Sequence, residues 1–136
     1  MASLRTNLDA AIFAKLNVEA VHTAAPGGVF NTMAPQDAKP PYVVFQAVSK
    51  VDDHSFSKRF AEALYQVKAV SRQPWPKEAA DIDDDIDTAL EDTTLTITGY
   101  TPLLCRREAD IYLVEQANGE VWHHIGGTYR IIADET

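Results

Sequence analysis

Disulfide partners and long apolar runs are missing from this chain of 136 residues. Its one cysteine, Cys105, cannot form an intrachain disulfide, so the sequence fits a protein that folds in a reducing compartment. No apolar run approaches the ~20 residues that cross a bilayer, and residues 1–7 lack the apolar core of a signal peptide. We therefore expect a protein that is soluble and cytoplasmic when it is made, with no membrane partner.

Positive charge is also scarce, because 12 lysines and arginines are set against 20 aspartates and glutamates. The net charge of -8 disfavours a protein that binds nucleic acid by neutralising phosphates, and it also disfavours binding to acidic membranes. The length is typical of one domain that buries roughly 65 to 70% of its unfolded surface. Because no internal repeat is visible, residues 1–136 are expected to form a single domain.

Two strand-like runs lie close together near the middle of the chain. Residues 41–49 are dense in β-branched and aromatic side chains, whereas residues 63–72 alternate with a period of two. The polar segment between them is too long for a two-residue turn. We expect a hairpin with a projecting arm at residues 51–59, mobile in the free protein and ordered at an assembly contact.

Two amphipathic helices are predicted on either side of this hairpin, over residues 4–16 and from Pro76 to about Asp92. Residues 29–33 are predicted to form an edge strand. Strand composition returns in four later segments, namely 95–98, 101–107, 110–115 and 121–132 with a bulge at Gly126 and Gly127. This order favours an α+β fold with an antiparallel sheet of about four strands, two helices packed on one face and a long β-hairpin arm.

An aspartate cluster in the second helix has the spacing of a calcium site but lacks one required residue. Asp81, Asp83 and Asp85 alternate like the first ligands of a calcium loop. The sixth position of such a loop needs glycine for its sharp turn, and this chain has Ile86 there. We therefore interpret these aspartates as a solvated acidic helix face.

Other residues that could bind a metal, act as a nucleophile or anchor an interface have simpler interpretations. His123 and His124 are adjacent, so on a strand they point to opposite faces and cannot bind one zinc ion. Cys105 has no flanking signature of a nucleophile, and a small buried cysteine is the usual case. We expect no metal, no cofactor and no catalytic residue. Of the two tryptophans, Trp75 is a candidate interface anchor, and Trp122 is expected in the core.

Several segments together resemble the tail-terminator, or tail-completion, family of long-tailed bacteriophages. They are LDAAIFAKL at residues 8–16, VFNTMAP at 29–35, KPPYVVFQ at 39–46, YQVKAV at 65–70 and YRII at 129–132. The similarity spans nearly the whole chain. The most specific pieces are the proline-tyrosine-valine entry to the first long strand and the tyrosine-arginine near the end.

The resemblance implies a structural virion protein, not an enzyme, assembled in the host cytoplasm and located in the tail or neck. Such a protein caps the finished tail tube as a ring, ends polymerisation of the tube and offers a surface to the head connector. Its partners would be further copies of itself in a ring with six-fold symmetry, the tail tube protein and the head-tail connector. No cofactor is expected.

Two other functions are compatible with the sequence. One is a head-tail neck adaptor of the same virion, and the other is a small cytoplasmic α+β enzyme or ligand-binding domain with a pocket formed by His54, Tyr65 and Arg130. For the virion protein, we expect the arm to be anchored on a neighbour by one aromatic residue and two cations that meet an acidic helix face. These interaction residues are Phe56, Lys58 and Arg59 on the arm, and Asp81, Asp84 and Asp85 on the helix.

Overall fold

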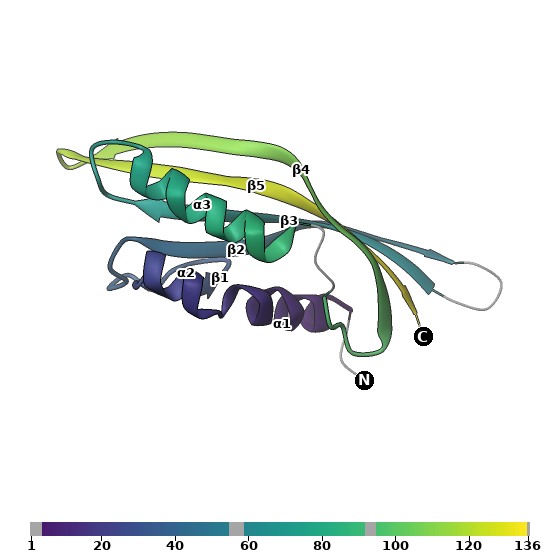
Figure 1. Cartoon of the computed structure of the whole chain (residues 1–136). Coiled ribbons are helices and arrows are strands. Elements are labelled where there is room, and N and C mark those ends of the chain that lie inside the picture. The colour runs from purple at the N-terminus through teal and green to yellow at the C-terminus, as the bar shows by residue number, and fades with distance from the viewer. Residues whose placement is uncertain (1–3, 55–58, 92–94, 136) are drawn as a thin grey trace.

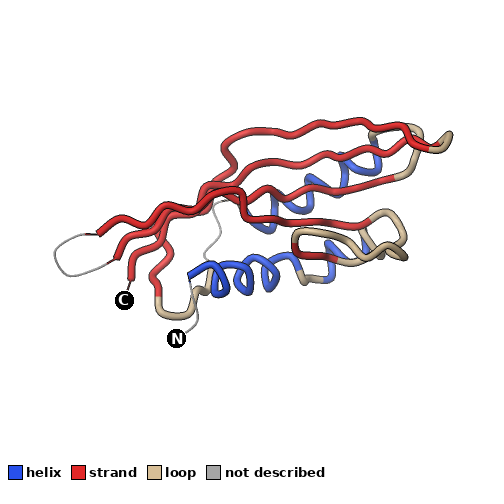
Figure 2. Tube along the Cα trace, turned by 180° about the vertical axis from the view of Figure 1, so that it is seen from behind, coloured by secondary structure: helices blue, strands red, loops and turns tan. Residues whose placement is uncertain are grey.

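The computed structural model describes residues 4–54, 59–91 and 95–135, and the side chains of residues 5–49, 62–91 and 95–134. It is a two-layer α+β structure in which the helices cover one face of a long twisted sheet, as Figures 1 and 2 show from opposite sides. The elements are α1 (Leu4–Leu16), α2 (Glu19–Ala24), β1 (Val29–Asn31), β2 (Tyr42–His54), β3 (Arg59–Ser71), α3 (Lys77–Leu90), β4 (Tyr100–Ala117) and β5 (Glu120–Glu135).

The two predicted helices are confirmed, and each buries one apolar stripe against the sheet. In α1 the buried residues Leu8, Ile12 and Leu16 recur every four positions, and in α3 the stripe includes Ile82 and Ile86. The short helix α2 was not predicted, because its six residues contain only one buried apolar side chain. None of the helices in the described residues is long and apolar enough to cross a membrane.

The sheet has five strands in the order β1-β2-β3-β5-β4, and every pair except β1 with β2 is antiparallel. The predicted antiparallel sheet of about four strands is confirmed for β2, β3, β5 and β4, and β1 adds a short parallel pair at one edge. The edge position of β1 was predicted correctly, although the strand is only three residues long. A chain that returns from β1 through the proline-rich loop of residues 34–41 enters β2 in the same direction, which makes the pair parallel.

The central hairpin alternates as the sequence predicts: Tyr65, Val67 and Ala69 are buried under the helices, and Leu64 and Gln66 lie on the other face. The predicted arm is shorter than expected. Residues 51–54 and 59–62 pair in register as continuations of β2 and β3, so part of the predicted arm forms paired strand. Together with β5, these strands extend beyond the helices at one end of the molecule (Figure 1).

The C-terminal half differs from its predicted boundaries in two ways. Residues 95–98 do not form a strand; they contribute one isolated bridge, between Ile97 and Tyr100. The two predicted strands at 101–107 and 110–115 are one strand, β4, with irregular register at Leu103 and Glu108.

The bulge predicted at the two glycines of β5 is absent, since β3 and β5 pair without a shift through Gly126 and Gly127. The glycines instead allow close approach. A Cβ atom on Gly126 would lie 2.0 Å from the carbonyl oxygen of Val67, and one on Gly127 would lie 2.5 Å from Nε of Arg107.

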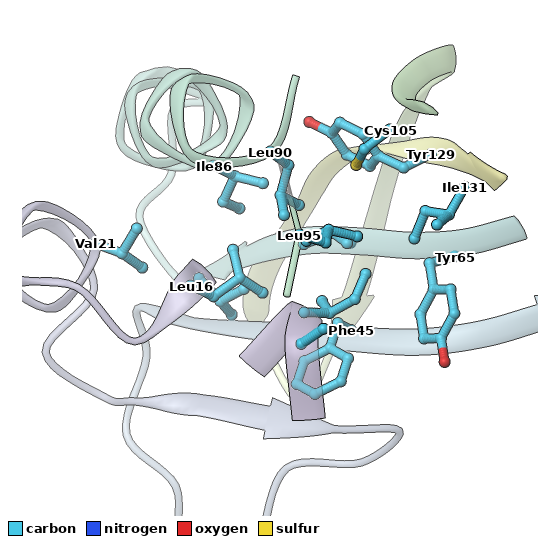
Figure 3. Packing of buried hydrophobic residues seen from close by; sticks show 14 of the residues in the cluster. Leu16, Val21, Phe45, Tyr65, Ile86, Leu90, Leu95, Cys105, Tyr129 and Ile131 are labelled. Atoms are coloured by element: carbon cyan, nitrogen blue, oxygen red, sulfur yellow. The ribbon is translucent and has the colours of Figure 1, made fainter. Parts of the chain in front are cut away.

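One apolar core lies between the helices and the inner face of the sheet (Figure 3). Its largest fully buried side chains include Tyr65, Tyr129 and Phe45. Cys105 is buried there, as expected, with 3% of its surface exposed. Trp122 was expected in the core but lies half-buried outside it, with the Arg72 guanidinium 5.6 Å from the centre of its ring.

Candidate functional site

Arg107 is the centre of a polar cluster that fastens α3 to the sheet. Strand β4 directs its side chain under α3, where only 15% of the side chain is exposed. The space for the guanidinium exists because β5 has Gly127 beside it, two residues from Tyr129, the register partner of Arg107; a larger residue at position 127 would collide with the guanidinium. Arg106, the preceding residue on the strand, is exposed.

Acidic groups surround this guanidinium on three sides. Arg107 donates two hydrogen bonds to the carboxylate of Asp83, at 3.0 and 2.9 Å, and one to Asp110 at 2.8 Å. A carboxylate oxygen of Asp87 lies 3.7 Å away. Arg107 also donates to the carbonyl oxygen of Gly126 at 2.6 Å. Fork-shaped pairing of this kind fixes both distance and angle between an arginine and a carboxylate.

The electrostatics of this cluster favour a charged Arg107. Burial lowers the pKa of the guanidinium, but the hydrogen bonds and negative charge of Asp83 outweigh it and raise the pKa above its ordinary value. Asp83 is itself almost buried, at 9% exposure. Because each charge is paired and hydrogen-bonded, this cluster is a structural connection and not a free reactive group.

Two buried tyrosines tie the two long helices to the sheet at neighbouring positions. The Tyr65 hydroxyl donates a hydrogen bond to Asp9 of α1 at 2.5 Å, and the Tyr129 hydroxyl donates one to Asp87 of α3 at 2.9 Å. Figure 3 shows the two hydroxyl groups pointing in opposite directions from the core. Burial is the main cause that raises the pKa of both phenols, with smaller contributions from Asp9 and Asp87.

The acidic residues predicted for contact lie on the outer surface of α3. Asp81 and Asp84 are exposed, and Asp85 is half-buried. Asp81 accepts a hydrogen bond from Lys77 at 2.7 Å, one helical turn earlier. The sequence did not separate these residues from Asp83 and Asp87, which point inward; the arginine that binds them is 20 or more positions later in the chain.

The arm residues predicted for contact are only partly described. Phe56 and Lys58 lie outside the described residues. Arg59 begins β3, where it pairs with His54 across the hairpin.

The alternative pocket of His54, Tyr65 and Arg130 does not form. Leu64, not Tyr65, is the register partner of Arg130, so Tyr65 and Arg130 lie on opposite faces of the sheet. Arg130 forms ion pairs with Glu62 and Glu108 on the outer face. This geometry removes the convergent polar groups on which the hypothesis of a small ligand-binding domain depended.

The two adjacent histidines have separate environments. His123 is buried with Nε2 3.2 Å from the carbonyl oxygen of Pro74, and Nε2 of His124 lies 2.7 Å from a carboxylate oxygen of Glu115. No group of three or more potential metal ligands occurs among the residues that the structure describes.

A shallow cleft lies beside exposed Trp75, at the start of α3. Its volume is about 490 Å³, and its lining includes Ala24 of α2, Glu78 and Ile82. The sequence identified Trp75 as a candidate interface anchor, and its side chain is 75% exposed. The cleft has no assembled set of catalytic groups, because its charged residues are the lysine and acids of one helix turn.

Structural comparison shows which solved chains share this fold. A chain from a structure titled "Virion of native gene transfer agent (GTA) particle" matches 98% of this chain and 99% of its own, with a TM-score of 0.83 and 11% sequence identity. A second solved chain matches over 96% of both chains, with a TM-score of 0.61 and 13% identity. The fold is therefore one that occurs in a virion particle. No curated protein sequence matches.

The particular family follows from the sequence itself. The model of the family described as "Tail completion protein gp17" matches residues 10–132. The chain belongs to this family, and it is a structural protein of a phage tail. This assignment confirms the resemblance found in the sequence, which rested on segments distributed from residue 8 to residue 132.

Proposed function

We propose that this protein caps the finished tail tube as a closed ring, ends polymerisation of the tube and provides the surface that joins the tail to the head connector. Membership of the tail completion family over residues 10–132 carries the proposal. Its partners are then further copies of the chain, the tail tube protein and the connector, in a virion assembled in the host cytoplasm. The family resemblance in the sequence favours a ring of six copies.

Two features of the described structure support an assembly role. The described part of the chain leaves several large apolar side chains exposed, a feature that often marks protein contacts. By contrast, the charged groups under α3, which are Arg107, Asp83 and Asp87, pair with one another within the fold. We propose no catalytic activity and no cofactor for this protein.

The tip of the β2–β3 hairpin is proposed as one contact with a neighbour. In this proposal, Phe56 inserts into the neighbouring subunit, and Lys58 and Arg59 meet the outer acids of its α3 helix, which are Asp81, Asp84 and Asp85. The exposure of Asp81 and Asp84 supports this, since both are accessible to a partner. Burial of the aromatic anchor would supply most of the affinity. The charged residues around it would mainly set the register of the contact and the rate of encounter.

Polymerisation of tail tube protein in the presence of the purified chain tests the function. The chain is expected to bind tube ends and to stop their growth at substoichiometric amounts, with rings visible at the ends in negative stain. Tubes that grow unchanged while the chain binds connector alone would support the neck adaptor instead. Binding to neither would refute both assignments.

A further inference from the structure

Exposed apolar side chains gather at the two opposite edges of the sheet. Four of the nine large ones in the described residues belong to β4, and three belong to the side formed by α1, β1 and β2. The first group includes Tyr112, Leu113 and Val114, exposed by 60, 52 and 44%. The second group is Phe13, Met33 and Val48, exposed by 41, 78 and 56%.

The first edge, which we name the β4 edge, consists of residues 109–117. These residues pair with β5 without a register shift, and among the described residues no strand pairs with the other side of β4. Natural proteins usually protect such an edge with lysine, proline or a bulge. Residues 109–117 contain neither lysine nor proline, and the nearest bulge precedes them at Glu108. Their two acids, Asp110 and Glu115, are paired within the fold with Arg107 and His124. A regular and largely apolar edge of this kind is suited to pairing with another chain.

The second edge, which we name the β1 side, is formed by β1, the start of β2 and α1 beside them. Strand β1 pairs with only three residues of β2, ending at Phe45. Beyond that point no strand in the described residues pairs with β2 on this side. Val48 lies in this unpaired stretch, at a bulge, and Met33 directly follows the turn after β1.

The two parts of the chain that contain these edges differ in charge. Residues 1–50, which include α1, α2 and β1, contain four lysines and arginines and three acids, a net charge of +1. Residues 51–136, which include α3, β4 and β5, contain eight lysines and arginines and seventeen acids, a net charge of -9. Pairing of two β4 edges would bring two strongly acidic halves together, whereas a β4 edge against a β1 side avoids this repulsion.

We propose that the β4 edge of one copy docks on the β1 side of the next copy, so that copies associate head to tail. The inference rests on the proposed ring, and it names the surfaces that form it. A contact between two different surfaces generates a closed ring when its rotation closes, whereas a contact of one surface with itself stops at a dimer.

Three full-length variants test this contact. Leu113→Lys places a charge on the β4 edge, and Met33→Lys with Val48→Lys does so on the β1 side. Trp75→Lys, at an exposed residue of neither edge, tests the cleft beside α3 as the alternative contact. Circular dichroism and melting temperature establish that each variant is folded. Association is measured by sedimentation over a range of concentrations, and rings are counted in negative stain.

The first two variants should each weaken self-association about tenfold or more and lose rings, since a buried unpaired lysine opposes the contact. Under the proposal, Trp75→Lys should assemble like the wild type. An equal mixture of the two edge variants should form complexes of two copies that grow no further. Each variant retains the surface that the other has lost, so a single contact is restored.

Other outcomes overturn the proposal. Dimers that survive in the β1-side variant, and disappear only with Leu113→Lys, would show that β4 edges pair with each other. Loss of association only in Trp75→Lys would place the contact at the cleft beside α3. If all three variants form rings and stop tube growth like the wild type, the proposed contact is wrong and the function stands. A wild-type chain that does not associate even on tail tubes would refute the ring itself.

Discussion

Tyr65 and Tyr129 are register partners across β3 and β5, yet their hydroxyl groups hold different helices. Tyr65 bonds to Asp9 of α1, and Tyr129 bonds to Asp87 of α3. Both rings are almost fully buried, at 1% and 0% exposure. The pair therefore holds both long helices on one face of the sheet.

Removal of either hydroxyl should destabilise the fold without unfolding it. Tyr65→Phe and Tyr129→Phe each lose a buried hydrogen bond to a carboxylate, at a cost of ~1 to 2 kcal/mol. The melting temperature should fall by roughly 3 to 8 °C in each variant. Tyr112→Phe is the matched control, because Tyr112 is 60% exposed and should show no change. Unchanged stability in both core variants would show that the two hydroxyl bonds do not secure the helices.

The same two phenols should make the folded state less stable in alkali. Burial, together with Asp9 and Asp87, raises the folded-state pKa of both tyrosines above the ordinary value of 10.0. Their contribution is complete below pH 10 and declines as the pH rises from 10 toward the folded-state pKa, because the unfolded chain loses these protons first. Urea unfolding between pH 8 and 11 measures this decline. The Tyr65→Phe/Tyr129→Phe variant should show a shallower decline than the wild type; identical slopes would refute the assignment.

Loss of the Arg107 charge should lower the free energy of unfolding more than most single substitutions do. Arg107→Met leaves Asp83 almost buried and without its partner, which costs about 3 kcal/mol. Arg106→Met, one residue earlier and exposed, should change the unfolding free energy by less than ~1 kcal/mol, because interactions of exposed charged side chains contribute little. Chemical denaturation of the two variants in parallel makes this comparison. Equal effects would show that the cluster under α3 contributes no special stability.

The hairpin tip should contribute to assembly and little to folding. Phe56→Ala is expected to leave the melting temperature nearly unchanged and to abolish tail completion, because an aromatic anchor at an interface typically contributes ~2 kcal/mol or more. Thermal unfolding and a tail-completion assay on the same preparation separate the two effects. A large loss of thermal stability would place Phe56 in the core instead.

Elements with a strong local pattern were predictable from the sequence. The α1 and α3 stripes, and the alternation around Tyr65, each recur with the period of their secondary structure. These patterns gave the α+β class, the helical layer and the central hairpin. Segments with weak patterns were missed or divided, such as α2 with its single buried residue and β4 with its bulge at Glu108.

Relationships that depend on distant partners could not be predicted. Gly126 and Gly127 resemble a bulge in sequence, but their role comes from the backbone of β3 and from Arg107 on β4. The acids of α3 divide between solvent and Arg107, and this depends on a strand that follows the helix. The same reason explains why the parallel pairing of β1 was missed, since local composition does not fix the direction of a partner strand.

Electron microscopy of tails assembled without this protein tests the central claim most directly. Deletion of the gene for this protein from the genome that encodes the tail should give tail tubes of variable and excessive length with no heads attached. Supply of the wild-type chain in trans should restore one uniform length, with a ring at the head-proximal end. Tails of uniform normal length in the deletion strain would contradict the claim that this protein ends tube growth.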